Sequence, residues 1–200
     1  MSQLDVARTP IPPPRIPRIT VDQYHRMIET GMLTEGAPIE LIDGMLVCKD
    51  RSARGEDPMS IGKRHRKIVM RFVDLSQLVK ARGATLFIQS PISIAPQHEP
   101  EPDACVARGG ADDYDDRNPC PGDVCCVIEV ADSSLAYDRT TKLQIYAQAG
   151  IPQYVIVNLI DRQLEVYEEP VPADGRYART FVAKAGETVA LLAGASEKLT

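Results

Sequence analysis

The sequence predicts an α/β or α+β domain, with one mixed β-sheet flanked by α-helices, on three observations. Two continuous apolar runs, VCCVIEV at 124–130 and YVIVNLI at 154–160, are typical of strands buried on both faces. A helical pattern at 132–150 separates these runs, and a longer amphipathic pattern occupies 62–81. A chain of 200 residues is long enough to bury such a core without disulfides.

The N-terminal segment differs in composition from this core. Residues 1–19 include five prolines, which predict an extended arm and not part of the core. Residues 20–200 have ordinary globular composition, with 44% hydrophobic and 26% charged residues in the whole chain. We therefore expect a Pro-rich arm followed by a single domain.

A short helix and a hairpin are expected at the start of this domain. Thr20 and Asp22 are candidate N-caps, and Gly31 is a candidate stop. The apolar runs ELI and MLV flank Asp43 and Gly44, and Asp-Gly between two such runs is a strong hairpin signal.

The remaining chain is divided by its turn residues and apolar runs. Gly83 is expected to end the helix at 62–81. The other assignments are a loop at 50–60, a strand with a proline kink at 85–94, a strand at 104–107, a loop at 109–122, a pairing strand at 161–170, and a strand or turn with a loose tail over the last twenty residues.

Composition excludes several classes of protein. The net charge of −5 and the pI near 5.3 argue against a uniformly basic nucleic-acid coat protein. No apolar run approaches the roughly 18 residues of a membrane span, and no export signal is visible. The five cysteines form no Cys-x-x-Cys pair, so we expect reduced core thiols in a cytoplasmic protein.

Charge is distributed unevenly along the chain. Residues 51–82 contain nine Lys or Arg against three acids, whereas 99–138 contain eleven acids against two Arg. This succession points to a polyanion-binding protein with an acidic, metal-binding centre. The alternative is two solvated faces of opposite charge.

Two acids are predicted to face each other across neighbouring strands. If the strand at 104–107 pairs antiparallel with 124–130 through their loop, the simplest register places Asp103 opposite Glu129. Opposed residues have Cβ atoms about 4.5–5.5 Å apart and point to the same face. Two carboxylates this close repel unless one is protonated or a cation lies between them, and oxygen ligands favour Mg²⁺ or Mn²⁺.

The next helix supplies a cation, Lys142, which follows Glu129 by thirteen residues. A lysine beside a metal-bound water could orient that water or help it to lose a proton. The alternative is an ordinary surface pair with Asp138, four residues earlier on the same helix.

The motifs in this region resemble those of a known superfamily. The run EPDACVAR, followed by VCCVIEVADSSLAYDRTTKLQIYAQAGIPQYVIVNL, resembles the PD-(D/E)XK nucleases, and within them the Uma-two family of restriction-endonuclease-like proteins. The earlier run YHRMIETGMLTEGAPIELIDGMLV resembles the opening of that family. The resemblance covers roughly residues 19 to 170, with the motifs in the expected order.

The resemblance implies a restriction-endonuclease-like core that binds Mg²⁺, with Mn²⁺ as a substitute, and hydrolyses DNA phosphodiester bonds. By motif, Asp103 and Glu129 are the two catalytic acids. They would hold the metal together with the carbonyl of Val130. Such a metal polarises the scissile phosphate and acidifies a water.

Two further catalytic residues are implied by the same resemblance. Glu40, in ELIDG, matches an additional acid near the N-terminus, although an acid before an Asp-Gly turn is usually solvated. The motif lysine should stand two residues after Glu129, but Ala131 occupies that position. In this family the lysine has moved to the following helix, where this chain has Lys142.

The basic start of the long helix is the predicted nucleic-acid contact. Its residues, expected to grip the phosphate backbone of DNA, are Lys63, Arg64, His65, Arg66 and Lys67. His65 could instead contact the metal, or be a surface or cap residue. Gln89 could line the same cleft, whereas Tyr146 is assigned to the core.

Other functions are compatible with these residues. The net acidity and Ala131 favour a non-catalytic nucleic-acid- or protein-binding module on a degenerate nuclease fold. A weaker alternative is a small-molecule hydrolase that uses the same metal. Symmetric cleavage of duplex DNA needs two active sites, so an active nuclease is expected to be a homodimer.

Overall fold

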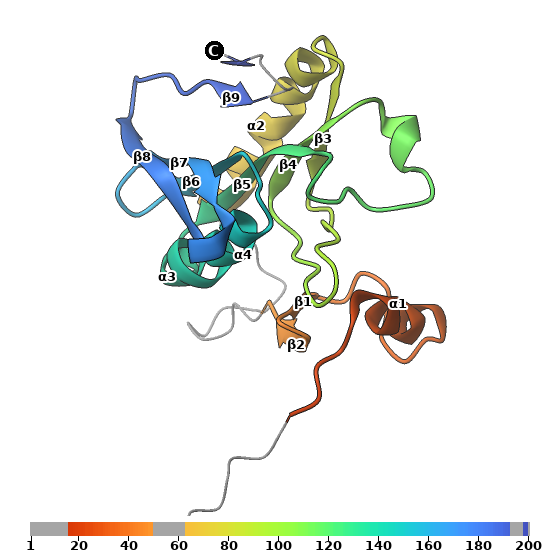
Figure 1. Ribbon diagram of the computed structural model, residues 1–200. Coiled ribbons are helices and arrows are strands. Elements are labelled where there is room, and N and C mark those ends of the chain that lie inside the picture. The colour runs from red at the N-terminus through yellow and green to blue at the C-terminus, as the bar shows by residue number, and fades with distance from the viewer. Residues whose placement is uncertain (1–15, 50–62, 193–197, 200) are drawn as a thin grey trace, which may run out of the picture.

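The computed structural model describes residues 16–49, 63–192 and 198–199. Most of the predicted N-terminal arm and the whole predicted loop at 50–60 lie outside these ranges, and the division into arm and domain stays a prediction. The predicted mixed sheet is confirmed (Figure 1). Its strands, in spatial order, are β3 (Ala84–Ile88), β4 (Ala104–Arg108), β5 (Val124–Ala131), β6 (Gln153–Asn158), β7 (Gln163–Val171) and β8 (Arg176–Lys184).

Pairing in this sheet is parallel between β5 and β6 and antiparallel elsewhere. The parallel pair needs a crossover, which the helical segment after β5 supplies. Every residue of β5 is buried, which explains its unbroken apolar run. Short elements complete the set: η2 (Ala111–Tyr114), η4 (Pro172–Asp174), and the small sheet of β9 (Leu191–Leu192) and β10 (Lys198–Leu199).

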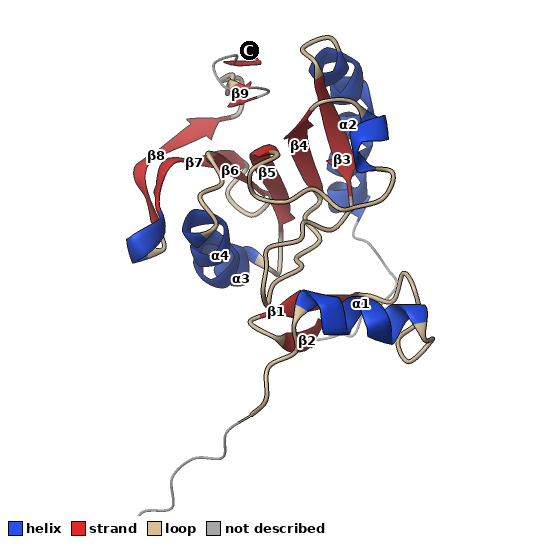
Figure 2. Ribbon diagram, turned by 45° about the vertical axis from the view of Figure 1, so that its right-hand side comes forward, coloured by secondary structure: helices blue, strands red, loops and turns tan. Residues whose placement is uncertain are grey.

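Helices cover both faces of the sheet (Figure 2). On one face α2 (Lys63–Lys80) packs Phe72 and Val79 against Ile128 of β5. On the other, Val127 belongs to the core cluster that contains Tyr146. That second face is covered by α3 (Leu135–Tyr137), the π-helical turn η3 (Asp138–Lys142) and α4 (Leu143–Gln148).

The N-terminal helix and hairpin lie beside this sheet and outside it (Figure 1). Helix α1 (Val21–Glu29) begins at Thr20, whose side chain accepts the backbone N–H of Gln23 in a capping box. The predicted hairpin is confirmed as β1 (Ile39–Ile42) and β2 (Met45–Cys48).

Glycine is required at the turn of this hairpin. Asp43 and Gly44 have φ values of 50° and 64°, the left-handed pair that a two-residue hairpin turn needs. A Cβ on Gly44 would approach the Cβ of Arg18 to 2.6 Å. The hairpin is joined to the loop before β4 by a bridge between Leu41 and Glu99. This pairing places β1 next to the segment that leads into β4.

Two predicted elements differ from the structure. The strand expected at 85–94 ends at Ile88, because Gln89 turns into the left-handed region with φ 47°. The helix expected at 132–150 is divided into α3, η3 and α4 by the π-helical turn. Ser134 occupies its N-cap position, but its hydroxyl donates to Asp138 and caps no backbone N–H.

The cysteine prediction is confirmed for three residues. Cys105, Cys125 and Cys126 are buried free thiols, whereas the free thiols Cys48 and Cys120 are exposed. Among the helices in the described ranges, none combines the length and the apolar character that a membrane crossing requires.

Candidate active site

The pairing of β4 with β5 brings the two motif acids together. Ala104 pairs with Ile128, which is the predicted register, and Asp103 and Glu129 adjoin this last pair of the ladder. At the other end a register shift after Val106 pairs Ala107 with Val124, one residue away from the expected pairing. The shift lies away from the acids, so their juxtaposition is kept.

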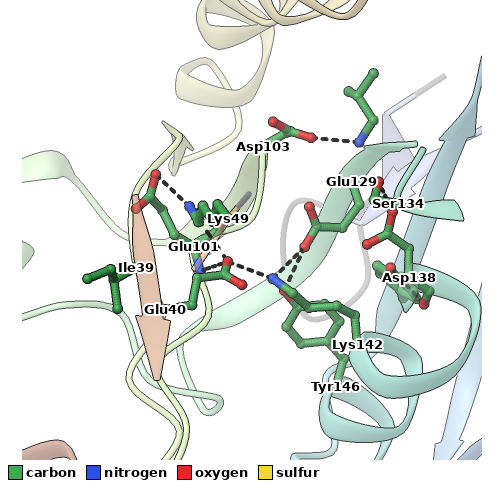
Figure 3. A network of polar contacts seen from close by, with 12 residues as sticks. Ile39, Glu40, Lys49, Glu101, Asp103, Glu129, Ser134, Asp138, Lys142 and Tyr146 are labelled. Carbon is green, nitrogen blue, oxygen red and sulfur yellow. Dashed lines mark hydrogen bonds and ion pairs between the residues drawn. The ribbon is translucent and has the colours of Figure 1, made fainter. Parts of the chain in front are cut away.

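Asp103 is held by the backbone of β5. Its Oδ2 accepts the backbone N–H of Val130 at 2.8 Å (Figure 3). Its own carbonyl accepts the N–H of Gln89, whose side chain is exposed. The Asp103 carboxylate is therefore anchored on β5, just before the start of β4, with one oxygen fixed by the N–H of Val130.

Glu129 lies on the face covered by α3, η3 and α4. Its Oε1 accepts the Tyr146 hydroxyl at 3.0 Å and the Lys142 ammonium at 3.3 Å. Burial raises the pKa of Glu129 against the opposing attraction of Lys142, and the charge of Asp103 acts in the same direction as burial. Tyr146 is part of the core, as predicted, but its hydroxyl also belongs to the site.

The π-helical turn positions Lys142. Both ends of this turn, Asp138 and Lys142, are buried, and Ser134 donates to Asp138 at 2.7 Å. The predicted alternative of a surface pair is therefore wrong. Burial opposes the charge of Lys142, but Glu129 and Glu40 outweigh it and raise the pKa of Lys142 above its usual value. Burial also raises the pKa of Asp138 to about 6.

Glu40 joins the N-terminal hairpin to this cluster. Its Oε1 accepts Lys142 Nζ at 2.7 Å and the backbone N–H of Glu101 at 2.8 Å. Lys49 Nζ lies 3.6 Å from the same oxygen and 2.9 Å from Glu101 Oε1. Glu40 is 4% exposed, so the solvated alternative does not apply. Figure 3 shows Glu40 and Glu129 approaching Lys142 from two sides.

The structure separates the predicted nucleic-acid residues into two groups. Arg66 and Lys67 are exposed near the start of α2, and nothing is described of the side chains of Lys63 and Arg64. His65, by contrast, is 7% exposed and faces the sheet. Its position follows from helical spacing, because His65 precedes Ile68 and Phe72 on the stripe of α2 that packs on the sheet.

His65 contacts the same two strands as the motif acids. Its Nδ1 lies 3.1 Å from the carbonyl oxygen of Val130, and its Nε2 lies 2.9 Å from Asp103 Oδ1. The Val130 carbonyl, predicted as a metal ligand, therefore faces an imidazole nitrogen. His65 Nε2 and the hydroxyl of Tyr137 are the buried side-chain polar atoms without a hydrogen-bond partner among the described residues.

The side chains gathered here are of the types that hold a divalent ion. Across residues 16–49, 63–192 and 198–199, no three His, Cys, Asp or Glu side chains already surround a common point. Asp103 and His65 do meet at 2.9 Å, and Glu129 adjoins the same last pair of the β4–β5 ladder as Asp103. Lys142 and Tyr146 both bind Oε1 of Glu129, so an ion would meet its other oxygen. Carboxylates beside a buried nitrogen without a partner are suitable metal ligands.

Sequence reasoning missed Lys49 and gave Tyr146 no part in the site. Tyr146 follows Lys142 by four residues, a spacing that puts both on one helix face. Lys49 follows Val47 by two residues, and Val47 is the hairpin partner of Glu40. Alternation in the strand therefore places Lys49 on the side of Glu40. Both spacings could have identified these residues once the side of the helix or strand that faces the site is known.

Comparisons with known proteins agree with this architecture. A family model named Uma2, described as "Putative restriction endonuclease", matches residues 21–199. A solved structure described as "a putative nuclease belonging to DUF820", from Anabaena variabilis ATCC 29413, is similar with a TM-score of 0.56 and 19% identity. The similarity covers 82% of this chain and 83% of that chain, and it shows a shared fold. A search of curated proteins finds no match. Because the family model spans most of the sequence, the chain belongs to the Uma2 family of restriction-endonuclease-like proteins.

Proposed function

We propose that this protein is a Mg²⁺-dependent endonuclease that hydrolyses DNA phosphodiester bonds and can use Mn²⁺ in place of Mg²⁺. One pattern supports the proposal: the last pair of the β4–β5 ladder, Ala104 with Ile128, adjoins Asp103 and Glu129, and Lys142 Nζ lies 3.3 Å from Glu129 Oε1. Two acids that can hold a metal ion, beside a lysine, suit metal-assisted hydrolysis of a phosphodiester.

Asp103 and Glu129 would hold the ion, which supplies a polarised phosphate and an acidified water. Each acid is anchored before any ligand arrives. The backbone N–H of Val130 fixes one oxygen of Asp103, and Tyr146 and Lys142 fix one oxygen of Glu129. Such anchoring lowers the reorganisation needed at the moment of reaction.

Lys142 acts as a donor in this proposal. An ammonium donates hydrogen bonds and accepts none, so its task is to orient water and to balance negative charge on the phosphate. Glu40 is a positioning residue, because it binds Lys142 at 2.7 Å and is itself held by the backbone of Glu101. This arrangement would let a lysine outside the usual motif position serve the same site.

Phosphate binding is assigned to the exposed part of the basic segment. Arg66 and Lys67 are exposed beside the buried His65. Contacts of this kind give binding with little sequence preference that weakens as salt increases. A homodimer and a cytoplasmic location stay predictions.

The proposal is tested by DNA cleavage with purified protein and each divalent ion. Asp103→Asn and Glu129→Gln should lower the rate at least about 100-fold, as expected when a charge-stabilising group is removed. Asp112→Asn, at an exposed acid of η2, is the matched control and should cleave at the wild-type rate. Equal cleavage after removal of divalent ions, or full activity in both site variants, contradicts the proposal.

A non-catalytic binding module is the second candidate, favoured by Ala131 at the motif position and by the engagement of Glu129 with Lys142 and Tyr146. It predicts a gel shift of DNA at low salt with no cleavage by any divalent ion. Cleavage that depends on Asp103 would exclude it.

A further inference from the structure

We propose that His65 is an inner-sphere ligand of the metal and that its imidazole gives the site a preference for Mn²⁺ over Mg²⁺. The inference rests on the proposed function, because it concerns the same ion. It begins from a contact that no hydrogen bond explains. His65 Nε2 lies 2.9 Å from Asp103 Oδ1, yet this nitrogen has no hydrogen-bond partner among the described residues.

The orientation of the imidazole ring explains why Nε2 lies close to Asp103 and still forms no hydrogen bond. Asp103 Oδ1 is close enough to accept a proton from Nε2 but lies off the line along which that proton would point. The two atoms form an ion pair when the ring is protonated on both nitrogens; on a neutral ring protonated at Nδ1, their lone pairs repel unless a cation lies between them. Both side chains are buried, at 7% and 8% exposure, so water cannot readily screen the contact.

Two ligands of one ion have this geometry. A divalent ion held by both side chains would keep the two ligand atoms within contact distance of each other. Each lone pair then points at the ion and not at the neighbouring ligand. Two ligands of one ion would therefore show both features of His65 Nε2 and Asp103 Oδ1: the 2.9 Å separation and the lack of a hydrogen bond.

The other ring nitrogen has the partner that a metal-binding histidine needs. His65 Nδ1 lies 3.1 Å from the Val130 carbonyl oxygen, a contact that only a protonated Nδ1 can make as a hydrogen bond. A proton on Nδ1 leaves Nε2 of the neutral ring as the metal-binding atom. Metal-bound histidines commonly donate their second ring N–H to a backbone carbonyl in this way.

The sheet and α2 hold this ligand rigidly. His65 lies on the stripe of α2 whose next members, Ile68 and Phe72, pack on the sheet. Asp103 is fixed by Val130, so both ligands are anchored on the same residue of β5. An imidazole suits transition metals, whereas Mg²⁺ prefers oxygen ligands alone. The composition of the site therefore favours Mn²⁺.

The test uses electron spin echo spectroscopy of Mn²⁺ bound to the full chain, which detects a directly coordinated ¹⁴N nucleus without any substrate. Wild type should show the ¹⁴N coupling, and His65→Gln should lose it. The variant should also bind Mn²⁺ at least about tenfold more weakly, which is the loss typical of removing even an outer-shell partner. Its preference for Mn²⁺ over Mg²⁺ in calorimetric titrations should decrease.

His25→Gln is the matched control. His25 lies on α1, where it binds Glu99 at 2.8 Å, and it should leave the ¹⁴N coupling unchanged. Circular dichroism melting establishes that each variant is folded. Bound Mn²⁺ without ¹⁴N coupling in wild type, or coupling that persists in His65→Gln, overturns the role of His65 and leaves the two-acid site standing. Absence of Mn²⁺ binding in folded wild type overturns both proposals.

Discussion

Glu129 and Glu165 stand in one row across the sheet, on either side of Ile156, and both are buried. They nevertheless have opposite surroundings. Glu165 accepts hydrogen bonds from Nη2 and Nε of Arg139, at 2.6 and 2.8 Å, and from Asn158 and Tyr167. Burial alone would raise the pKa of Glu165, but these donors outweigh it and lower the pKa to about 2.

Glu129 has fewer partners, and it shares the charged one. Lys142 lies closer to Glu40, at 2.7 Å, than to Glu129, at 3.3 Å. Lys142 is shared between two buried carboxylates, of which Glu40 also has Lys49 at 3.6 Å, and burial raises the pKa of Glu129. Glu165 is therefore a structural carboxylate whose charge is balanced by its hydrogen-bond donors. The buried charge of Glu129 is balanced only in part, so Glu129 is the one suited to binding a cation.

The largest expected effect on stability comes from removing the cation of each cluster. Lys142→Met leaves Glu129 buried without its ammonium and Glu40 with the more distant Lys49, and it should lower the free energy of unfolding by about 3–5 kcal/mol. Arg139→Met should cost less, about 1–2 kcal/mol, because Glu165 keeps its other donors. Urea denaturation at pH 7 measures both losses.

The Lys142 effect has an internal check. If the loss arises from uncompensated acids, adding Glu40→Gln to Lys142→Met should recover part of the stability. Equal losses from the two single cation variants, or no recovery in the double variant, would contradict the contrast between the clusters.

Replacing each carboxylate by an amide should give the second largest difference in stability between the two clusters. Glu165→Gln removes the charged acceptor of Arg139 and should cost about 1–3 kcal/mol. Glu129→Gln should change stability by less than about 1 kcal/mol or increase it, because removing a poorly compensated buried charge relieves its desolvation. Thermal melting of the two variants at pH 7 compares them, and a greater loss in Glu129→Gln would reverse our assignment.

The smallest expected effect is the change with pH in how much Glu165 stabilises the fold. The pKa of Glu165 is lowered from 4.5 to about 2 in the folded protein. Its stabilisation is therefore complete above about pH 4.5 and disappears as the pH falls toward 2. The difference in urea midpoint between wild type and Glu165→Gln should be large at pH 7 and small near pH 2.5. A constant difference over that window would show that Glu165 does not titrate as the structure implies.

Much of this fold is local and could be predicted. The Asp43–Gly44 hairpin, the stripe of α2 and the apolar runs of β5 and β6 follow from periodicity and turn chemistry. The pairing of Ala104 with Ile128, beside Asp103 and Glu129, also followed, because antiparallel pairing constrains register. The bulge after Val106 was not predictable, since nothing in the loop length indicates on which side an extra residue is absorbed.

The less predictable features depend on contacts between distant segments. Glu40 binds a lysine that lies 102 residues further along the chain, and no local pattern indicates that contact. The π-helical turn that buries both Asp138 and Lys142 has no strong sequence signal. His65 was grouped with its charged neighbours, although its spacing from Phe72 placed it on the buried stripe.

The central claim is that Glu129, and not Glu165, is the carboxylate of this row that binds a divalent ion. Isothermal titration of Mg²⁺ and Mn²⁺ into wild type, Glu129→Gln and Glu165→Gln tests it most directly, without a DNA substrate. We predict that wild type and Glu165→Gln bind one ion with similar affinity and that Glu129→Gln shows no measurable binding. Unchanged binding in folded Glu129→Gln, or its loss in folded Glu165→Gln alone, would contradict the account.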